Sequence, residues 1–385
     1  MVGRKRTLVL AGILFMGSAV GCALAGSVIE LIAGRFVGGM GVGLASTVSP
    51  MFIAEISPAR LRGKMVMLFQ LAVGVGLLMS VFVTYLLSFG GHWRWMFATQ
   101  AAPVLCLVIG LAFVPESPRW LAAVGRLGEA LGVLARINGQ ARAEREIGEI
   151  QDELAEESGG FRELLRPGVR LALVLGVVLM VFSQINGVNM IGLYTPTIFL
   201  AAGITNTPDA ILNSVFLDCF IIPWTLTAIW LIRIFPRRSI LIVGTITMAV
   251  GHFLMFLTFT FHLPPVFSLA AMLVPCGAYT LSLAALSWVV LSEIFPNRIR
   301  AKAMSIATCV MFASSYVTTI LFPMVLDWFT RRQGQPGGTF LIFMVVCLGC
   351  TIFVWKMLPE TKDKTLEEMG KFWLDRDRVG PKEPG

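Results

Sequence analysis

The stretch Glu55-Ile-Ser-Pro-Ala-Arg-Leu-Arg-Gly-Lys64 returns 238 residues later as Glu293-Ile-Phe-Pro-Asn-Arg-Ile-Arg-Ala-Lys302, with six of its ten positions identical. Pro115-Glu116-Ser117 corresponds in the same way to Pro359-Glu360-Thr361, 244 residues further on. The basic run Gly3-Arg4-Lys5-Arg6 corresponds to Pro236-Arg237-Arg238-Ser239 at an offset of 233. Three matches in the same order, at nearly the same offset, indicate an internal duplication.

The segments between these motifs are strongly apolar. Of 385 residues, 56% are hydrophobic and only 14% are charged, and the mean hydropathy is +0.79. A soluble domain would need more polar residues to cover its surface, so the composition indicates a membrane protein. Ten apolar stretches are long enough to cross a bilayer. They are 7–27, 30–54, 64–88, 94–114, 170–200, 210–232, 239–262, 266–293, 302–327 and 339–358.

A charged stretch separates four of these spans from the other six, so we expect an all-α polytopic membrane protein of two pseudo-repeated bundles. Two amphipathic helices, at 126–137 and 143–157, are expected in the charged stretch, with Ile147, Ile150 and Leu154 on one face. The predicted parts are an incomplete four-helix bundle (1–114), a cytoplasmic helical linker (115–168), a six-helix bundle (169–358) and a cytoplasmic tail (359–385).

The duplication also predicts that the first bundle is short by two helices. Two spans precede the basic motif at 236–239, whereas none precedes the corresponding motif at 3–6. Ten spans would then stand where internal symmetry requires twelve. A start codon placed too late and a truncated, inactive gene are the two explanations left open.

Loop charges give the orientation. With a cytoplasmic N-terminus, twelve basic residues fall in inner loops and three in outer loops, so the positive-inside rule places both termini in the cytoplasm of a plasma or inner membrane. The inner residues are Arg4, Lys5, Arg6, Arg60, Arg62, Lys64, Arg233, Arg237, Arg238, Arg298, Arg300 and Lys302, and the outer ones are Arg94, Arg331 and Arg332. Because the net charge of +8 lies in these short loops, it does not indicate nucleic-acid binding.

The sequence does not favour an enzyme. It contains no nucleotide-binding loop, no predicted metal site and no His–acid–nucleophile grouping around its three histidines. The pair Cys347-x-x-Cys350 lies inside an apolar run and is interpreted as small apolar helix residues rather than a redox or metal motif. We expect no cofactor, a lipid environment, a small-molecule partner and a monomer.

The motifs resemble those of the sugar porter family of the major facilitator superfamily over essentially the whole chain. The most specific pair is Pro115-Glu-Ser-Pro-Arg-Trp-Leu121 and Pro359-Glu-Thr-Lys-x-Lys-Thr-Leu-Glu-Glu368, at the ends of the two halves. Supporting motifs are Gly34-Arg-Phe-Val-Gly-Gly-Met-Gly-Val-Gly43, Pro50-x-Phe-x-x-Glu55, Trp93-Arg-Trp95, Gln184-x-x-Gly-x-Asn189 and Trp288-x-x-x-x-Glu-Ile-Phe-Pro296. The resemblance implies secondary-active or facilitative transport of a sugar or polyol by alternating access.

Repeated acids and arginines at the helix ends predict a charge network on the cytoplasmic side. An arginine offers a planar fork to a carboxylate, so such pairs can latch neighbouring helices together. The resemblance implies that this latch holds the outward-open state and parts when the cavity opens inward. The predicted members are Arg4, Glu55, Arg62, Glu116, Arg119, Arg237, Arg238, Glu293, Arg300 and Glu360.

Polar side chains at membrane depth are the candidates for sugar binding, because they are costly there unless they are used. Amides both donate and accept hydrogen bonds, as sugar hydroxyls do. The candidates are Gln70, Gln184, Asn189, Trp288, Ser183 and Tyr194. On an unbroken helix Gln184 and Asn189 would lie about 140° apart, although Asn186, Gly187 and Gly192 suggest a broken or bent helix.

Departures from the family pattern keep other substrates open. The family usually has glutamine, tyrosine and asparagine where this chain has Ser183, Leu193 and Ile221. A carrier of another small polar solute and a non-transporting sugar-binding paralogue therefore remain alternatives. Arg35 and Asp218 are charges at membrane depth. Either residue could take part in proton coupling, or Asp218 could simply be hydrogen-bonded within its helix.

Overall fold

The computed structural model describes residues 3–58, 61–156, 164, 169–201, 206–295 and 297–362. Within these ranges ten helical segments have the length and apolar composition to cross a membrane, which confirms the ten expected spans, although the third begins at Leu71 and the ninth ends at Arg332. The chain consists of two compact units, Met1–Glu156 and Glu157–Gly385, each with many contacts within itself. The division falls inside the predicted linker, so α6 to α8 group with the first unit.

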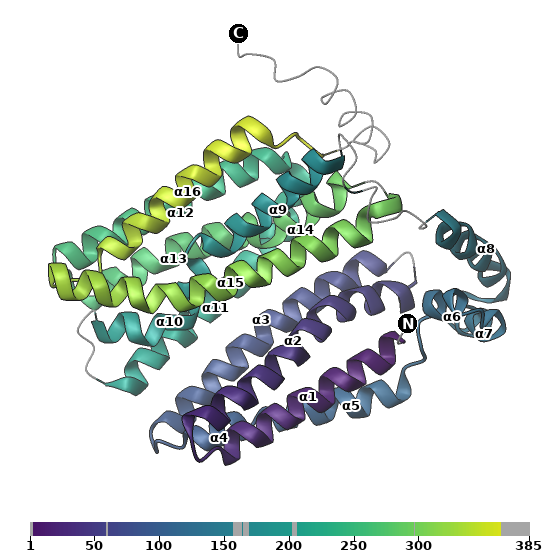
Figure 1. Ribbon diagram of the computed structural model, residues 1–385, viewed down its shortest axis with the longest axis horizontal. Coiled ribbons are helices and arrows are strands. Elements are labelled where there is room, and N and C mark those ends of the chain that lie inside the picture. The colour runs from purple at the N-terminus through teal and green to yellow at the C-terminus, as the bar shows by residue number, and fades with distance from the viewer. Residues whose placement is uncertain are drawn as a thin grey trace, which may run out of the picture. The chain divides into compact units, whose positions relative to one another are not determined.

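The described residues of the first unit form helices α1 to α8. Helices α1, α2, α3 and the pair α4–α5 lie side by side along their lengths (Figure 1), with α1 packed on both α2 and α5. Their bounds are α1 Arg4–Leu24, α2 Val28–Ile56, α3 Arg62–Ser88, α4 Trp93–Ala98, α5 Ala101–Phe113, α6 Pro118–Ala123, α7 Leu127–Asn138 and α8 Gln140–Glu156. Helices α4 and α5 together make one span, Trp93–Phe113.

The two helices expected in the charged stretch are α7 and α8. A small apolar cluster holds them to α6: Trp120, Leu121 and Ala130 are buried, and Ile147 and Ile150 pack against them. The predicted apolar face of the second helix is therefore turned inward, while the side chain of Leu154 lies outside the described residues.

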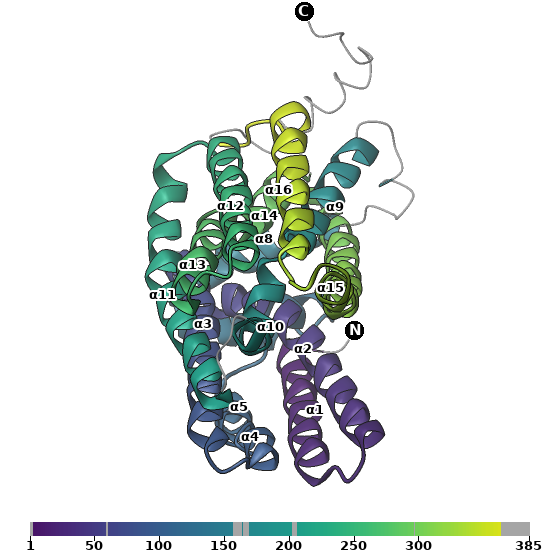
Figure 2. The same ribbon diagram turned by 90° about the vertical axis from the view of Figure 1, so that its left-hand side faces the viewer.

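The second unit contains the remaining helices. Helix α12 packs against both α16 and α13, and α9 packs against α15 (Figures 1 and 2). The bounds are α9 Val169–Ile185, α10 Val188–Ala201, α11 Thr207–Ile234, α12 Arg237–Thr260, α13 Pro265–Leu281, α14 Leu283–Ile294, α15 Asn297–Gln333 and α16 Gly338–Met357. Two of its spans are interrupted within the membrane-length segment, α9–α10 at residues 186–187 and α13–α14 at Ser282.

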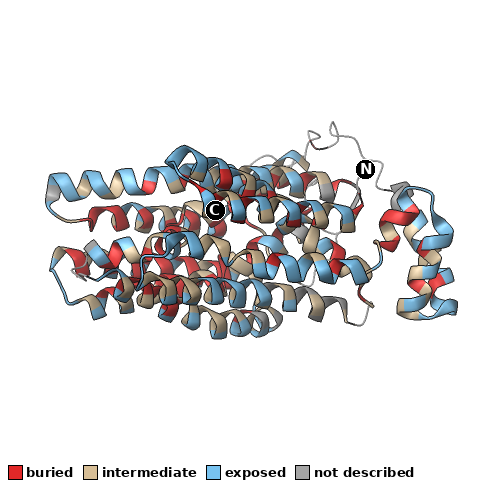
Figure 3. Cartoon of the chain, turned by 90° about the horizontal axis from the view of Figure 1, so that it is seen from below, coloured by how far each residue is buried: buried red, intermediate tan, exposed pale blue. Residues whose placement is uncertain are grey.

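The outer faces of the spanning helices are apolar. Figure 3 shows many exposed positions, in pale blue, along the helices that face the viewer. Large hydrophobic side chains occupy many of these positions; Phe36 is 72% exposed, Val266 75% and Phe113 84%. Surfaces of this kind would cause aggregation in water but are stable against acyl chains, so the helices are built for a lipid environment.

Small residues bring α1 and α2 close together. A Cβ atom on Gly34 would lie 2.8 Å from the Cys22 sulfur and 3.2 Å from the Cys22 backbone nitrogen, whereas a Cβ on Gly39 would meet nothing within 4 Å. Close backbone approach through glycine is a common way of packing helices in membranes, where dispersion contacts replace the hydrophobic effect.

These two glycines give a matched test of the packing. Gly34→Val should lower the free energy of unfolding by about 1–3 kcal/mol, because the added side chain overpacks a tight contact. Gly39→Val adds the same atoms to the same helix at an open position and serves as the control. The melting temperature in detergent measures both variants, and equal shifts would contradict the packing described.

Candidate functional site

The interruption between α9 and α10 is built around one asparagine. The Asn186 amide nitrogen donates to the carbonyls of Phe182 (3.0 Å) and Ser183 (2.7 Å), at the end of α9. Its side-chain oxygen accepts from the Val188 backbone nitrogen (3.0 Å), at the start of α10. The Asn186 side chain therefore caps both helices, because each end leaves backbone groups without an intrahelical partner.

Gly187 completes the interruption. Its φ of +88° lies in a region that L-residues with a side chain rarely adopt, and a Cβ atom there would overlap the Phe343 ring. Gly192, which the sequence also suggested as a break, lies inside α10. The further irregularity falls instead at Tyr194, whose φ and ψ of −107° and 16° are not helical.

The interruption brings the two candidate amides together. The Asn189 amide nitrogen donates to the Gln184 side-chain oxygen at 2.8 Å, and the Gln184 nitrogen lies 3.4 Å from the Ser183 hydroxyl oxygen. The 140° separation expected for an unbroken helix does not hold, because the chain changes direction between the two residues. Gln184 and Asn189 are both half-buried.

Tyr194 has partners on α15. The Tyr194 hydroxyl donates to the Thr319 carbonyl (3.2 Å), and its ring packs on Phe322 with centroids 5.0 Å apart. Trp288 is on α14 and is 41% exposed. The side chain of Gln70 lies outside the described residues.

A cluster of charged and polar groups joins the start of α1, the end of α2 and the segment after α5. Arg4 forms a two-pronged ion pair with Glu55, with both nitrogen–oxygen distances 3.2 Å. The Ser117 hydroxyl donates to the same carboxylate. Glu116 accepts from the backbone nitrogen of Lys5 at 2.9 Å. Its carboxylate therefore lies at the N-terminus of α1, where the helix dipole favours a negative charge.

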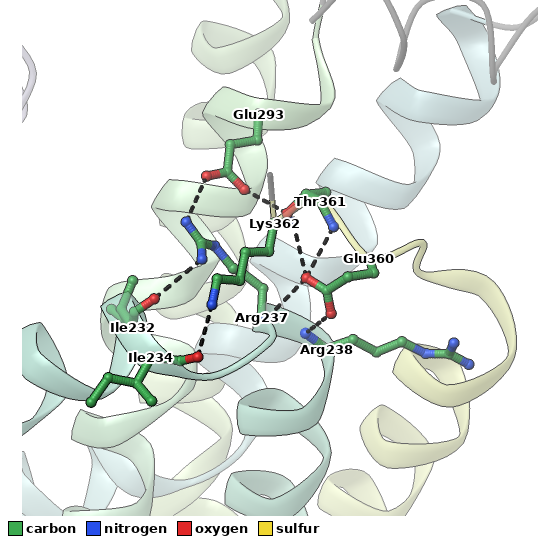
Figure 4. A network of polar contacts seen from close by, with 8 residues as sticks. All are labelled: Ile232, Ile234, Arg237, Arg238, Glu293, Glu360, Thr361 and Lys362. Carbon is green, nitrogen blue, oxygen red and sulfur yellow. Dashed lines mark hydrogen bonds and ion pairs between the residues drawn. The ribbon is translucent and has the colours of Figure 1, made fainter. Parts of the chain in front are cut away.

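The second unit contains the equivalent cluster (Figure 4). The Arg237 guanidinium donates to Glu293 at 3.3 Å, and the Thr361 hydroxyl donates to the other carboxylate oxygen at 2.5 Å. Glu360 accepts from the backbone nitrogens of Arg237 (3.0 Å) and Arg238 (3.1 Å), at the start of α12. Five groups thus correspond one to one between the units, so the duplication read from the sequence is present in atomic detail.

These contacts refine the predicted latch. The side chains of Arg4 and Arg237 pair with Glu55 and Glu293, while Glu116 and Glu360 bind backbone N–H groups. The Arg238 side chain donates to the Trp355 carbonyl instead of a carboxylate. Ser117 and Thr361 were not among the predicted residues; their position directly after the repeated glutamates is the signal that could have identified them. Arg119 also has an interaction. The side chains of Arg62 and Arg300 lie outside the described residues.

The two candidate coupling charges have different surroundings. Arg35 is exposed on α2, with its guanidinium carbon 5.9 Å from the centre of the Phe97 ring. Asp218 is half-buried on α11 close to Cys276. Asp218 does not form an ion pair with any residue whose side chain the structure describes.

A cavity of about 500 Å³ lies between α11, α12 and α13. Its lining is almost wholly apolar and includes Phe220, Trp224, Val243 and Leu273. Two of its hydroxyls, those of Thr247 and Ser282, already donate to carbonyls of their own helices. This cavity is unsuited to a sugar, and it is not lined by any candidate binding residue whose side chain the structure describes.

Ten spans in two units with repeated charge clusters define a membrane transporter of the major facilitator fold. The family model described as "Sugar (and other) transporter" matches residues 1–373. The chain therefore belongs to this family of sugar porters, and sugar transport is its class of function.

Several transporters are similar to the chain over most of its length. The D-xylose–proton symporter of Escherichia coli (strain K12) is 36% identical over 96% of this chain and 81% of its own length. The arabinose–proton symporter of Bacillus subtilis (strain 168) is 35% identical over 97% and 81%. An inward-open structure of the E. coli xylose transporter matches with a TM-score of 0.82 at 33% identity, covering 96% of this chain and 83% of that one.

The ion pairs at the helix ends can be tested through stability. Glu293→Gln keeps the side-chain shape but loses the charge that Arg237 and Thr361 contact, so we expect a loss of about 1–3 kcal/mol in the free energy of unfolding. Asp327→Asn, which breaks the exposed pair between Asp327 and Arg331 (2.9 Å), is the control and should cost about 0–1 kcal/mol. Denaturation of the purified protein checks both values, and a Glu293 variant as stable as its control would contradict the structural importance of the cluster.

Proposed function

We propose that this chain carries a pentose across the membrane by alternating access, in symport with protons. The observation that carries the proposal is the Gln184–Asn189 amide pair, placed at a helix interruption in a member of the sugar transporter family. The names of the relatives, which include symporters of D-xylose and of arabinose with protons, support a pentose and a proton.

The chemistry of the pair fits a sugar. With one amide hydrogen bonded between them, the pair keeps a donor on Gln184 and an acceptor on Asn189 for a hydroxyl, which can both accept and donate. Because the amides fix each other, little side-chain freedom is left to lose on binding. Gln70, Trp288, Ser183 and Tyr194 are further proposed contacts.

A second candidate function is transport of another small polar solute by the same fold. Ser183 favours it, because its hydroxyl donates to the Met180 carbonyl (2.7 Å) within its own helix and offers less to a ligand than the glutamine usual in the family. Leu193, where the family has tyrosine, is 60% exposed and adds no hydrogen bond from its side chain.

The charge clusters are proposed to act as latches during transport. Each joins three separate segments at the end of its unit through a guanidinium–carboxylate pair and backbone caps, and such bonds form and break without a change of fold. The predominance of basic residues in the same loops supports a cytoplasmic position for the clusters and for both termini. We also propose that the carrier works as a monomer, since the amide pair comes from a single chain.

Uptake by proteoliposomes containing the full chain tests the substrate. Labelled D-xylose or arabinose should enter faster than glucose or inositol, and Gln184→Ala or Asn189→Ala should raise KM about tenfold or more, because each removes a hydrogen bond and leaves its partner unpaired. Asn213→Ala is the control, as its amide donates to the Asp209 carbonyl (2.8 Å) near the start of α11.

The result also decides between the candidate functions. Competition by a non-sugar solute, with no uptake of any sugar, would replace the pentose proposal by the second function. Protein that binds sugar without moving it would identify a non-transporting paralogue.

Proton coupling is tested separately. An uncoupler should abolish accumulation of the sugar while leaving exchange of labelled for unlabelled sugar intact. If Asp218 carries the proton, Asp218→Asn should have the same effect and remove the pH dependence of uptake, whereas Asp209→Asn at the start of α11 should not. Accumulation with an unchanged pH dependence in the Asp218 variant would exclude this residue.

A further inference from the structure

A buried histidine meets the interruption between α9 and α10 from another helix. His252, on α12, has no exposed surface, and its Nε2 lies 2.8 Å from the carbonyl oxygen of Asn186. We propose that His252 is a positioning residue that fixes the interruption, and through it the amides of Gln184 and Asn189. The functional part of this inference rests on the proposed role of these amides in sugar binding.

The direction of the hydrogen bond follows from its partner. A carbonyl oxygen can only accept, so Nε2 carries the proton and donates it. The Asn186 carbonyl lies where the helix has ended, and in the membrane interior water does not replace the lost donor. A second contact on this oxygen is the Cys347 thiol, at 3.8 Å. Because a thiol is a weak donor, the imidazole supplies the stronger bond.

Aromatic packing holds the imidazole in place. The His252 ring packs on Phe343 with centroids 5.5 Å apart, and Phe343 stacks on Phe322 at 6.0 Å. Phe343 also fills the space that a side chain on Gly187 would need. The Nδ1 atom of His252 is buried and has no hydrogen-bond partner in the described part of the chain. His252 therefore leaves its Nδ1 acceptor without a partner in this part of the chain while its Nε2–H group donates to the Asn186 carbonyl.

The anchored carbonyl belongs to the residue that caps both helices. Asn186 follows Gln184 by two positions and precedes Asn189 by three, and its side chain bonds on both sides of the interruption. A shift of this carbonyl changes the relative direction of α9 and α10, and with it the 2.8 Å contact between the two amides. Among the described residues, no hydrogen bond joins His252 to either amide, so its effect on them is indirect.

Two substitutions separate the hydrogen bond from the space the ring fills. His252→Met is apolar and cannot donate, whereas His252→Gln has an amide nitrogen that can reach the same carbonyl. Thr245→Val is the matched control. It removes a buried bond on the same helix, to the Thr351 hydroxyl at 2.8 Å, away from the interruption.

Two readouts are measured on the full chain: the kinetics of sugar uptake, and hydrogen–deuterium exchange of the backbone at 186–191. His252→Met should raise KM about tenfold with a smaller change in kcat, as expected when a donor to a buried carbonyl is lost, and should speed exchange. His252→Gln and Thr245→Val should resemble the wild type in both readouts.

The proposal is overturned if His252→Met leaves both KM and exchange unchanged, or if His252→Gln or Thr245→Val is impaired to the same extent. Should the Met variant fail to fold, His252→Asn replaces it, because its shorter amide stops short of the carbonyl. If the wild type takes up no sugar, the proposed function fails. Hydrogen–deuterium exchange alone then tests whether His252 anchors the Asn186 carbonyl. Faster exchange in the Met variant than in the Gln variant supports it, and equal exchange overturns it.

Discussion

Inside a bilayer, a backbone N–H or C=O group that leaves its helix must find a partner within the protein, since the hydrocarbon offers none. In the α9–α10 segment, Asn186 supplies several of these partners. The side chain bonds backbone groups on both sides, and the carbonyl receives the imidazole of His252. The interruption can therefore persist at membrane depth and present two amides from one stretch of chain.

The same constraint is met differently at the helix ends. The first backbone N–H groups of α1 and α12 have no intrahelical acceptor, and a glutamate from a distant segment supplies one in each unit. In each unit a second glutamate binds an arginine side chain and a hydroxyl. Glu55 contacts Arg4 and Ser117, and Glu293 contacts Arg237 and Thr361. Charge, capping and tertiary contact are thus combined in a few side chains, which explains why these positions recur in both halves of the sequence.

The sequence predicted the spans well, because each is a long apolar run bounded by charges and because the motifs repeat at a nearly constant offset. The sequence did not predict which polar groups pair with one another. Motif spacing placed Arg4, Glu55 and Glu116 at the same membrane face, but it did not show that the guanidinium pairs with Glu55 while Glu116 caps a helix. The contact between Gln184 and Asn189 was also missed, since helical periodicity stops being informative where the helix stops. His252 lies within an apolar run, and only the packing of α12 against its neighbours shows what it contacts.

The charge clusters also bear on the order in which the polypeptide is assembled. Arg4 and Glu55 are synthesised early, but the hydroxyl and carboxylate that complete their cluster belong to Ser117 and Glu116. The charge cluster of the first unit can therefore form as soon as residue 117 has left the ribosome, before any of α9 to α16 has been translated. The second cluster needs Thr361, which is translated after all of these helices. The nascent chain can thus complete the polar cluster of the first unit before the second unit has been translated. This shortens the time during which the backbone and charged groups at its helix ends lack their partners.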